Sequence, residues 1–250
     1  MMNKEYLSIA DMMSGLMMVF LLIAIVFMLD VQRSKDEIEQ QKNEIEQQKN
    51  EIERQKNAMA EIAEMAEQSR QLLHEKLLRE FESDLKRWNA DILSDNTVRF
   101  NAPKVLFKLG KSTLRPRFKT ILSDFFPRYV AILQVYRDEI EAIRIEGHTS
   151  SDWIKTDDVA MRYLKNVELS QRRALSTLTY CYALLQHSAR QRDWLQLVLR
   201  ANGLSFAKLI RNGDGSENAD KSRRVEFRVV TKAEEKLYQI LERSRSVNYQ

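Results

Sequence analysis

Asp11 is an ionisable residue next to a long apolar stretch, and this position limits the states in which its carboxylate is stable. It stands beside an apolar stretch, because the 18 residues from Met12 to Leu29 carry no charge before Asp30 closes the run. An ionised carboxylate costs roughly 2.5 to 3.5 kcal/mol at the centre of a membrane helix, so it persists where it faces a polar cavity or a partner. A second interpretation stays open, in which Asp11 is an interfacial residue near a helix N-terminus, where negative charge is favourable.

Small side chains follow Asp11 at helical spacing. Ser14 and Gly15 lie three and four residues further on, and Met18 lies one turn beyond them. Residues at this spacing share one face of a helix, and small side chains let a second helix approach closely. We therefore predict that Ser14, Gly15 and Met18 contact a partner helix.

The apolar stretch predicts a transmembrane helix over residues 9–30, preceded by a short N-terminal segment of residues 1–8. The length of the run suits a bilayer core of roughly 30 Å, crossed at about 1.5 Å per residue. The stretch lacks a basic segment before it and a small-x-small cleavage site after it, so we expect a retained helix instead of a signal peptide. Only Lys4 precedes the span and Arg33 and Lys35 follow it, so charge alone does not settle the orientation.

A helical spacer is expected over residues 31–88. Residues 37–57 form three copies of a seven-residue unit, EIEQQKN, EIEQQKN and EIERQKN, and a period of seven keeps one helical face aligned. Only Ile38, Ile45 and Ile52 are apolar in these units, so a coiled coil built on them alone is weak. We predict a solvated, dimerising spacer that packs against a folded domain near Trp88, with disorder of the Gln-rich part as the alternative.

Mixed strands and helices are expected beyond Asn89, in a domain over residues 89–232 that is followed by a C-terminal helix or tail over residues 233–250. The expected strands are 98–107 (clearest at 105–107), 142–146 and 224–230, and the expected helices are 116–136 and 166–185, with a further element at 191–200. Pro116 suits the first turn of its helix. The domain is therefore predicted to be a compact α/β sandwich, and the whole chain to be of the α+β class.

Composition narrows the function further. The chain has 40 Lys and Arg against 36 Asp and Glu, which gives no case for nucleic acid as a partner. Four basic residues near the C-terminus are interpreted as surface charge along a strand, namely Lys221, Arg223, Arg224 and Arg228. The three histidines are far apart in sequence, so we expect no metal and no cofactor. The one cysteine, Cys181, is interpreted as a small buried residue on a helix, and no arrangement of nucleophile and base predicts an enzyme.

Three motifs in the C-terminal half carry a family resemblance. The first is Gly147-His148-Thr149, the second is Asn166, Leu169, Ser170, Arg173 and Ala174, and the third is Arg223-Arg224-Val225-Glu226. In this order they resemble the OmpA-like peptidoglycan-binding family. The resemblance implies that the helix arginine and an aspartate after the threonine hold the diaminopimelate of the stem peptide. An arginine suits this task because it grips a carboxylate with two charge-assisted hydrogen bonds.

The implied peptidoglycan-binding residues are Thr149, Ser150, Asp152, Asn166, Ser170 and Arg173. Arg173 matches the helix arginine of the family, although an ordinary surface salt bridge is its alternative role. Ser150 occupies the place of the aspartate, and Asp152 is the nearest substitute. His148 is expected to stabilise the loop and not to bind ligand.

A second resemblance covers the N-terminal helix. The sequence Ala10-Asp11-Met12-Met13-Ser14-Gly15 is similar to the membrane helix of MotB-type stator subunits, in which the aspartate accepts a proton. Together with the heptads and the G-H-T-S-S-D-W sequence, the chain most resembles the ZorB subunits of Zorya anti-phage defence systems. That resemblance implies a MotA-like (ZorA-like) partner, with five copies around two of this chain. It also implies an inner-membrane location, with the N-terminus in the cytoplasm and the wall-binding domain in the periplasm.

The resemblances imply a proton-driven motor subunit that uses Asp11, although Na⁺ is not excluded as the transported ion. Two alternatives remain open. The chain is either a passive OmpA-like tether without ion flow, or an energy transducer similar in plan to TolR and ExbD. A tether predicts that Asp11→Asn is harmless, and the identity of the membrane partner separates the other two.

Overall fold

The computed structural model describes residues 2–101, 103–153, 158–185 and 189–232. The predicted C-terminal helix or tail over residues 233–250 lies outside the described residues. The chain divides into two compact units, Met1–Met59 and Ala60–Gln250. The first helix, α1, runs from Met2 to Trp88 and contributes to both units.

The first unit is the N-terminal part of α1. Its apolar segment is long and apolar enough to cross a membrane, and none of that segment is buried within the chain. It is the one such candidate among the described residues. The heptad units are helical throughout, and Ile38, Ile45 and Ile52 are each about two thirds exposed. The helical spacer is thereby confirmed, and its dimerisation stays a prediction.

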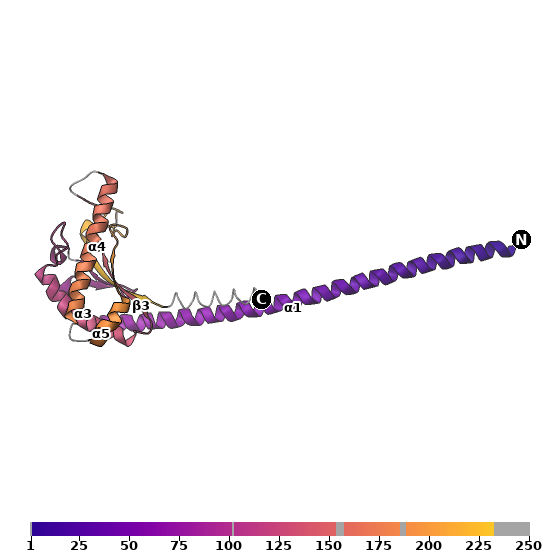
Figure 1. Ribbon diagram of the computed structural model, residues 1–250, viewed down its shortest axis with the longest axis horizontal. Coiled ribbons are helices and arrows are strands. Elements are labelled where there is room, and N and C mark those ends of the chain that lie inside the picture. The colour runs from indigo at the N-terminus through magenta and orange to yellow at the C-terminus, as the bar shows by residue number, and fades with distance from the viewer. Residues whose placement is uncertain (1, 102, 154–157, 186–188, 233–250) are drawn as a thin grey trace. The chain divides into compact units, whose positions relative to one another are not determined.

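The second unit contains one five-stranded sheet (Figure 1). Its strands are β1 (Ala90–Ile92), β2 (Val98–Phe100), β3 (Ile140–Gly147), β4 (Leu199–Gly203) and β5 (Val225–Thr231). Their order across the sheet is β1-β2-β5-β3-β4, and β3 and β4 are parallel whereas the other neighbours are antiparallel. Strand β3 therefore lies between β4 and β5, and its end at Gly147 is flanked by Gly203 and Val225.

The remaining helices of this unit are α2 (Pro103–Leu106), α3 (Pro116–Val135), α4 (Val159–Leu184), α5 (Ala189–Val198) and α6 (Ala219–Ser222). Helix α4 packs on β3 and β4, and α3 packs beside α4 (Figure 1). Pro116 occupies the first turn of α3, as expected from its fixed φ. Asp158 caps α4, because its carboxylate accepts hydrogen bonds from the backbone N–H groups of Ala160 and Met161.

Aromatic side chains join the last turns of α1 to the domain core. The ring centroid of Phe81 lies 5.2 Å from that of Phe125 on α3, and Trp88 lies 6.4 Å from Phe100 on β2. Leu77, four residues before Phe81, is also fully buried. The prediction that the helix meets a packing surface near Trp88 is confirmed.

The α+β class and the strands at 142–146 and 224–230 are confirmed. The strand expected at 105–107 is wrong, because residues 103–106 form α2 and only Phe107 makes an isolated bridge, to Leu114. A proline at the first helical position favours this short helix. Helix α4 begins at Val159, before the expected start at residue 166. Cys181 is buried on α4 and free, as interpreted from the sequence.

Candidate functional site

The site begins where β3 ends, because two glycines there let α4 pack directly on the parallel strand pair. A Cβ atom built on Gly147 would lie 2.3 Å from the carbonyl oxygen of Ser170, and one built on Gly203 would lie 2.4 Å from the backbone nitrogen of Gln171. Backbone atoms cannot move aside as a flexible side chain can. The glycines therefore fix the distance between α4 and the loop that follows β3.

Ser205 joins the loop to α4. Its backbone N–H donates to Ser170 Oγ at 3.0 Å, and its carbonyl oxygen accepts from the Thr149 N–H at 2.9 Å. Thr149, Ser170 and Ser205 are all buried. Two of the predicted site residues are thus held together through a third residue that the sequence analysis did not identify.

Arg173 is buried on α4, one turn after Ser170, with 6% of its surface exposed. Its Nε donates to the carbonyl oxygen of Lys111 at 3.0 Å, and its guanidinium carbon lies 4.9 Å from the ring centroid of Phe107. No acidic side chain among the described residues lies within 4.0 Å of it. The alternative role as a surface salt bridge is therefore wrong for the described part of the chain.

Ser150 lies next to a second arginine. Arg223 directs Nη1 toward Ser150 Oγ at 3.5 Å, and its Nη2 forms an ion pair with Asp220. The position of the family aspartate is therefore occupied by a hydroxyl that lies 3.5 Å from a guanidinium nitrogen of Arg223. Burial, together with a smaller effect from the positive charge of Arg223, lowers the pKa of Arg173 to about 10.

The other predicted residues have different settings. Asn166 is buried and donates to the Arg162 carbonyl oxygen within α4 at 3.1 Å, whereas Asp152 is exposed. The neighbouring Ser151 donates its N–H to Glu217 at 3.0 Å and its hydroxyl to the same carboxylate. The structure therefore joins Thr149 to Ser170 through Ser205, holds Arg173 on the next turn of α4, and leaves Asp152 in solvent.

A buried ion network lies beneath the loop. Glu226 accepts hydrogen bonds at Oε1 from Arg224 Nε at 2.6 Å and from Arg99 Nε at 2.7 Å, and its Oε2 lies 3.4 Å from His148 Nε2. Glu146 Oε2 lies 3.7 Å from the same ring nitrogen. The interpretation of Arg224 as surface charge is wrong, because Arg224 is only 4% exposed. In a half-exposed strand, apolar residues alternate with charged residues that face water. The same alternation arises in a strand that is buried on both faces if its charged residues form ion pairs.

The pKa values of this network follow from burial and charge. Burial lowers the pKa of the His148 imidazole, and the nearby Arg224 adds to the effect, so the ring is neutral at pH 7. Burial alone would raise the pKa of Glu226, but the contacts to His148 and Arg224 outweigh it and hold the pKa well below its usual range. His148 also donates its backbone N–H to the Arg224 carbonyl oxygen at 3.0 Å, which fits its expected role in stabilising the loop.

Ligand atoms of Glu146, His148 and Glu226 all lie within 4.8 Å of one another, as they would in a metal site. The charges around them argue for a different use. Arg99 and Arg224 both pair with Glu226, so the cluster already holds two positive charges beside its two carboxylates, and a divalent cation would add an uncompensated double charge to a buried space. We interpret the cluster as a network that supports the loop.

The residues predicted in the membrane lie in α1. Ser14, Gly15 and Met18 are exposed, and nothing lies within 4 Å of a Cβ atom built on Gly15. This face is open to a partner helix in the single chain. Asp11 lies in the same helix, one turn earlier.

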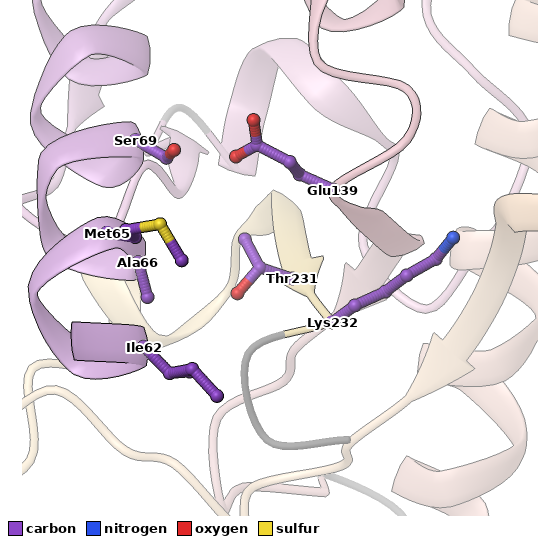
Figure 2. A pocket seen from close by; sticks show the side chains of 7 residues that line it. All are labelled: Ile62, Met65, Ala66, Ser69, Glu139, Thr231 and Lys232. Atoms are coloured by element: carbon purple, nitrogen blue, oxygen red, sulfur yellow. The ribbon is translucent and has the colours of Figure 1, made fainter. Parts of the chain in front are cut away.

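A pocket in another part of the second unit contains none of the predicted site residues (Figure 2). One wall is helix α1, and the other is formed where β3 begins and β5 ends. Its lining residues are Ile62, Met65, Ala66, Ser69, Glu139, Thr231 and Lys232.

The chain is similar to several solved structures over about two thirds of its length. A MotB-like protein from Desulfovibrio vulgaris is 21% identical, with a TM-score of 0.48, over 66% of this chain and 96% of its own. The cell wall anchor of the T6SS from Pseudomonas aeruginosa is 23% identical, with a TM-score of 0.43, over 62% of this chain and 96% of its own. The periplasmic domain of Helicobacter pylori MotB is 17% identical, with a TM-score of 0.41, over 62% of this chain and 97% of its own.

No protein-family model matches the sequence. A curated relative covers nearly all of it: the Zorya protein ZorB of Escherichia coli is 37% identical over 241 residues, which is 96% of this chain and 93% of that protein. The match includes the apolar helix, the heptads and the C-terminal domain. With that identity over almost the full length of both proteins, the chain belongs to the ZorB family.

Proposed function

We propose that this chain is a MotB-like stator subunit of a proton-driven inner-membrane motor that acts in anti-phage defence and is anchored to peptidoglycan. The observation that carries the proposal is the full-length relationship to ZorB. This chain also has a membrane-length helix that bears Asp11 and a domain with a buried arginine, Arg173. The N-terminus lies in the cytoplasm, and the domain lies in the periplasm.

Asp11 is the proton-carrying group in this proposal. Two copies of the chain present Asp11 to a surrounding ring of MotA-like (ZorA-like) subunits, five in number, through the face formed by Ser14, Gly15 and Met18. Protonation removes the charge of the carboxylate and changes which ring contact is preferred. A proton that crosses 100 mV releases about 2.3 kcal/mol, which is enough to bias one step of rotation.

Peptidoglycan binding keeps the chain from rotating with the ring. Arg173 supports this part of the proposal, because a buried guanidinium with no acidic partner among the described residues is ready to receive a carboxylate. Thr149 and Ser150 belong to the loop that Ser205 ties to Ser170, and Asn166 lies one turn before Ser170 on α4. Asp152 is exposed, so its attraction for a ligand ammonium is screened by water.

The test is phage protection in cells that carry the complete defence operon, with Asp11→Asn compared with wild type. Asp30→Asn is the matched control, because Asp30 closes the other end of the same apolar run. Asp11→Asn is expected to abolish protection while membrane levels and co-purification of the partner stay normal, and Asp30→Asn is expected to protect. Full protection with Asp11→Asn would overturn the motor and favour the passive tether.

A further inference from the structure

The pocket of Figure 2 is lined on one side by an apolar stripe of α1. The stripe consists of Ile62, Met65, Ala66 and Ser69, which are spaced three or four residues apart and therefore share one face of the helix. Met65 is 51% exposed, whereas Leu73, four residues beyond Ser69, is only 3% exposed. The domain therefore covers this face from Leu73 onward, and the open part of the stripe extends from Ser69 back toward Ile62.

The chain returns to this groove at the end of its last strand. Strand β5 ends at Thr231, and both Thr231 and Lys232 line the groove opposite α1 (Figure 2). The backbone N–H of Lys232 donates to the carbonyl oxygen of Glu139 at 2.9 Å, which fixes the point at which the chain leaves the sheet. Residues 233–250, the C-terminal segment, therefore begin beside the apolar stripe.

The sequence of the C-terminal segment has an apolar stripe of its own. Ala233, Leu237, Ile240 and Leu241 recur at helical spacing, and charged residues occupy most of the positions between them. This pattern predicts an amphipathic helix that needs a second apolar surface to cover it.

The start of this helix is also marked in the sequence. Thr231 and Glu234 have the spacing of a capping box, in which a threonine and a glutamate three residues later satisfy the first backbone N–H groups of a helix. A helix capped by Thr231 begins at the edge of the groove, because Thr231 lines it.

Charge favours the same pairing. Residues 60–69 of α1 contain three glutamates and no lysine or arginine, whereas Lys236, Arg243 and Arg245 give the later part of the C-terminal segment an excess of positive charge over Glu242. Exposed ion pairs contribute little energy, so apolar burial supplies most of the attraction and charge helps to set the orientation.

We propose that residues 233–244 form a helix that docks in this groove, antiparallel to α1 of the same chain, with Leu237 packed beside Ala66. The helix runs toward Ile62 because the domain already covers this face of α1 from Leu73 onward. A helix rises about 1.5 Å per residue, so roughly two turns of the C-terminal segment cover the stripe. The docked segment pairs a second helix with α1 and removes the apolar groove from solvent.

Disulfide trapping on the full chain in membranes tests the contact. Ala66→Cys is combined with Leu237→Cys or, as the matched control, with Gln239→Cys, which lies two residues away and on the opposite face of the proposed helix. The native Cys181 is fully buried and stays in place. After mild oxidation, mass spectrometry of the monomer is expected to find roughly tenfold more of the 66–237 disulfide than of the 66–239 disulfide.

Alkylation of the single variant Ala66→Cys by a maleimide measures the docking without a cross-link. A docked segment shields this cysteine, so adding Leu237→Asp is expected to raise the alkylation rate roughly tenfold, because the aspartate removes the burial of an apolar side chain. Gln239→Asp is the matched control, and its rate is expected to stay within about twofold of that of Ala66→Cys alone, since residue 239 faces solvent in the proposed helix.

Three results would overturn the inference. Equal yields of the two disulfides would mean that the C-terminal segment does not dock as a helix on this face. Equal alkylation rates for Leu237→Asp and Gln239→Asp would mean that Leu237 does not cover the groove. A dimer of Ala66→Cys alone on a non-reducing gel would mean that a second copy of α1 occupies the stripe in place of the C-terminal segment.

Discussion

Arg128 of α3 grips the last turns of α1 at Glu80, with its Nε 2.7 Å from Glu80 Oε1 and its Nη2 2.8 Å from the Glu80 carbonyl oxygen. The same guanidinium contacts Asp84 at 3.0 Å and covers the ring of Phe81, 4.8 Å from its centroid. The end of α1 is thus attached to the domain by the contacts of Arg128 with Glu80, Phe81 and Asp84, here called the Arg128 clamp, as well as by the aromatic core.

Arg128→Met should loosen this attachment. Methionine keeps an apolar side chain over Phe81 but removes one of the two arginines that contact Asp84, whose side chain is only 14% exposed, and leaves Arg87 as its remaining cation. We expect a loss of about 1–2 kcal/mol in the free energy of unfolding. Urea denaturation followed by fluorescence of the buried Trp88 measures it, with Arg137→Met at an exposed arginine as the control. A loss equal to that of the control would show that the clamp contributes nothing.

Gly147→Ala should damage both stability and binding. The new methyl group would meet the carbonyl oxygen of Ser170 at 2.3 Å, so either β3 or α4 must shift. Such overpacking costs about 1–3 kcal/mol and moves Arg173 relative to Ser150. Gly213→Ala is the matched control, because nothing lies within 4 Å of a Cβ atom there. Thermal unfolding and sacculus sedimentation together check the prediction, and wild-type behaviour of Gly147→Ala in both assays would contradict it.

The buried network predicts that acid destabilises the domain. The pKa of His148 is lower in the folded chain than in the unfolded chain, so the unfolded state binds the proton first as pH falls. The contribution of His148 is therefore fully present above its unfolded pKa of about 6.5 and is lost as pH drops below it.

Glu226 acts in the same direction at lower pH, because its pKa is lowered in the folded chain. Urea midpoints of the full chain should fall between pH 7.5 and pH 5, and His148→Asn should flatten the upper part of that slope. A midpoint that rises on acidification would mean that His148 is protonated in the folded chain.

The heptads predict that dimerisation and phage protection depend on the helical phase between Ile38 and Ile52. Deleting residues 44–50 removes one unit and rotates the following residues by only about 20°, so Ile38 and Ile52 stay on one stripe. Deleting residues 44–48 shortens the helix less but rotates Ile52 by about 140°. The shorter deletion should therefore reduce dimer yield in membrane cross-linking and phage protection more than the longer one. Equal effects would mean that the spacer acts by length alone.

Patterns of apolar residues predicted the main elements of the fold. Residues 142–146 and 224–230 alternate clearly, and both segments are central strands. Strand β4 was missed because Arg200 and Asn202 interrupt its apolar pattern at the sheet edge, where a strand pairs on one side only. Residues 105–107 have strand-forming side chains, yet the preceding Pro103 starts a short helix there.

The site could be predicted only in part. Arg173 and the loop after Gly147 were identifiable because they lie in motifs that resemble a known family. The contact between Arg223 and Ser150 joins residues that are 73 apart in sequence, and no local pattern indicates it. The burial of Arg224 was equally hidden. Its partner Glu226 lies only two residues further along the chain, but Arg99 reaches the same carboxylate only when β2 and β5 pair.

The most direct test of the central claim is proton uptake by proteoliposomes that contain this chain with its MotA-like partner. An inside-negative potassium potential is imposed in sodium-free buffer, and the internal pH is followed with a trapped dye. The account predicts acidification with wild type and with Asp30→Asn, and none with Asp11→Asn. Equal acidification with Asp11→Asn and wild type would contradict the assignment of Asp11 as the proton carrier.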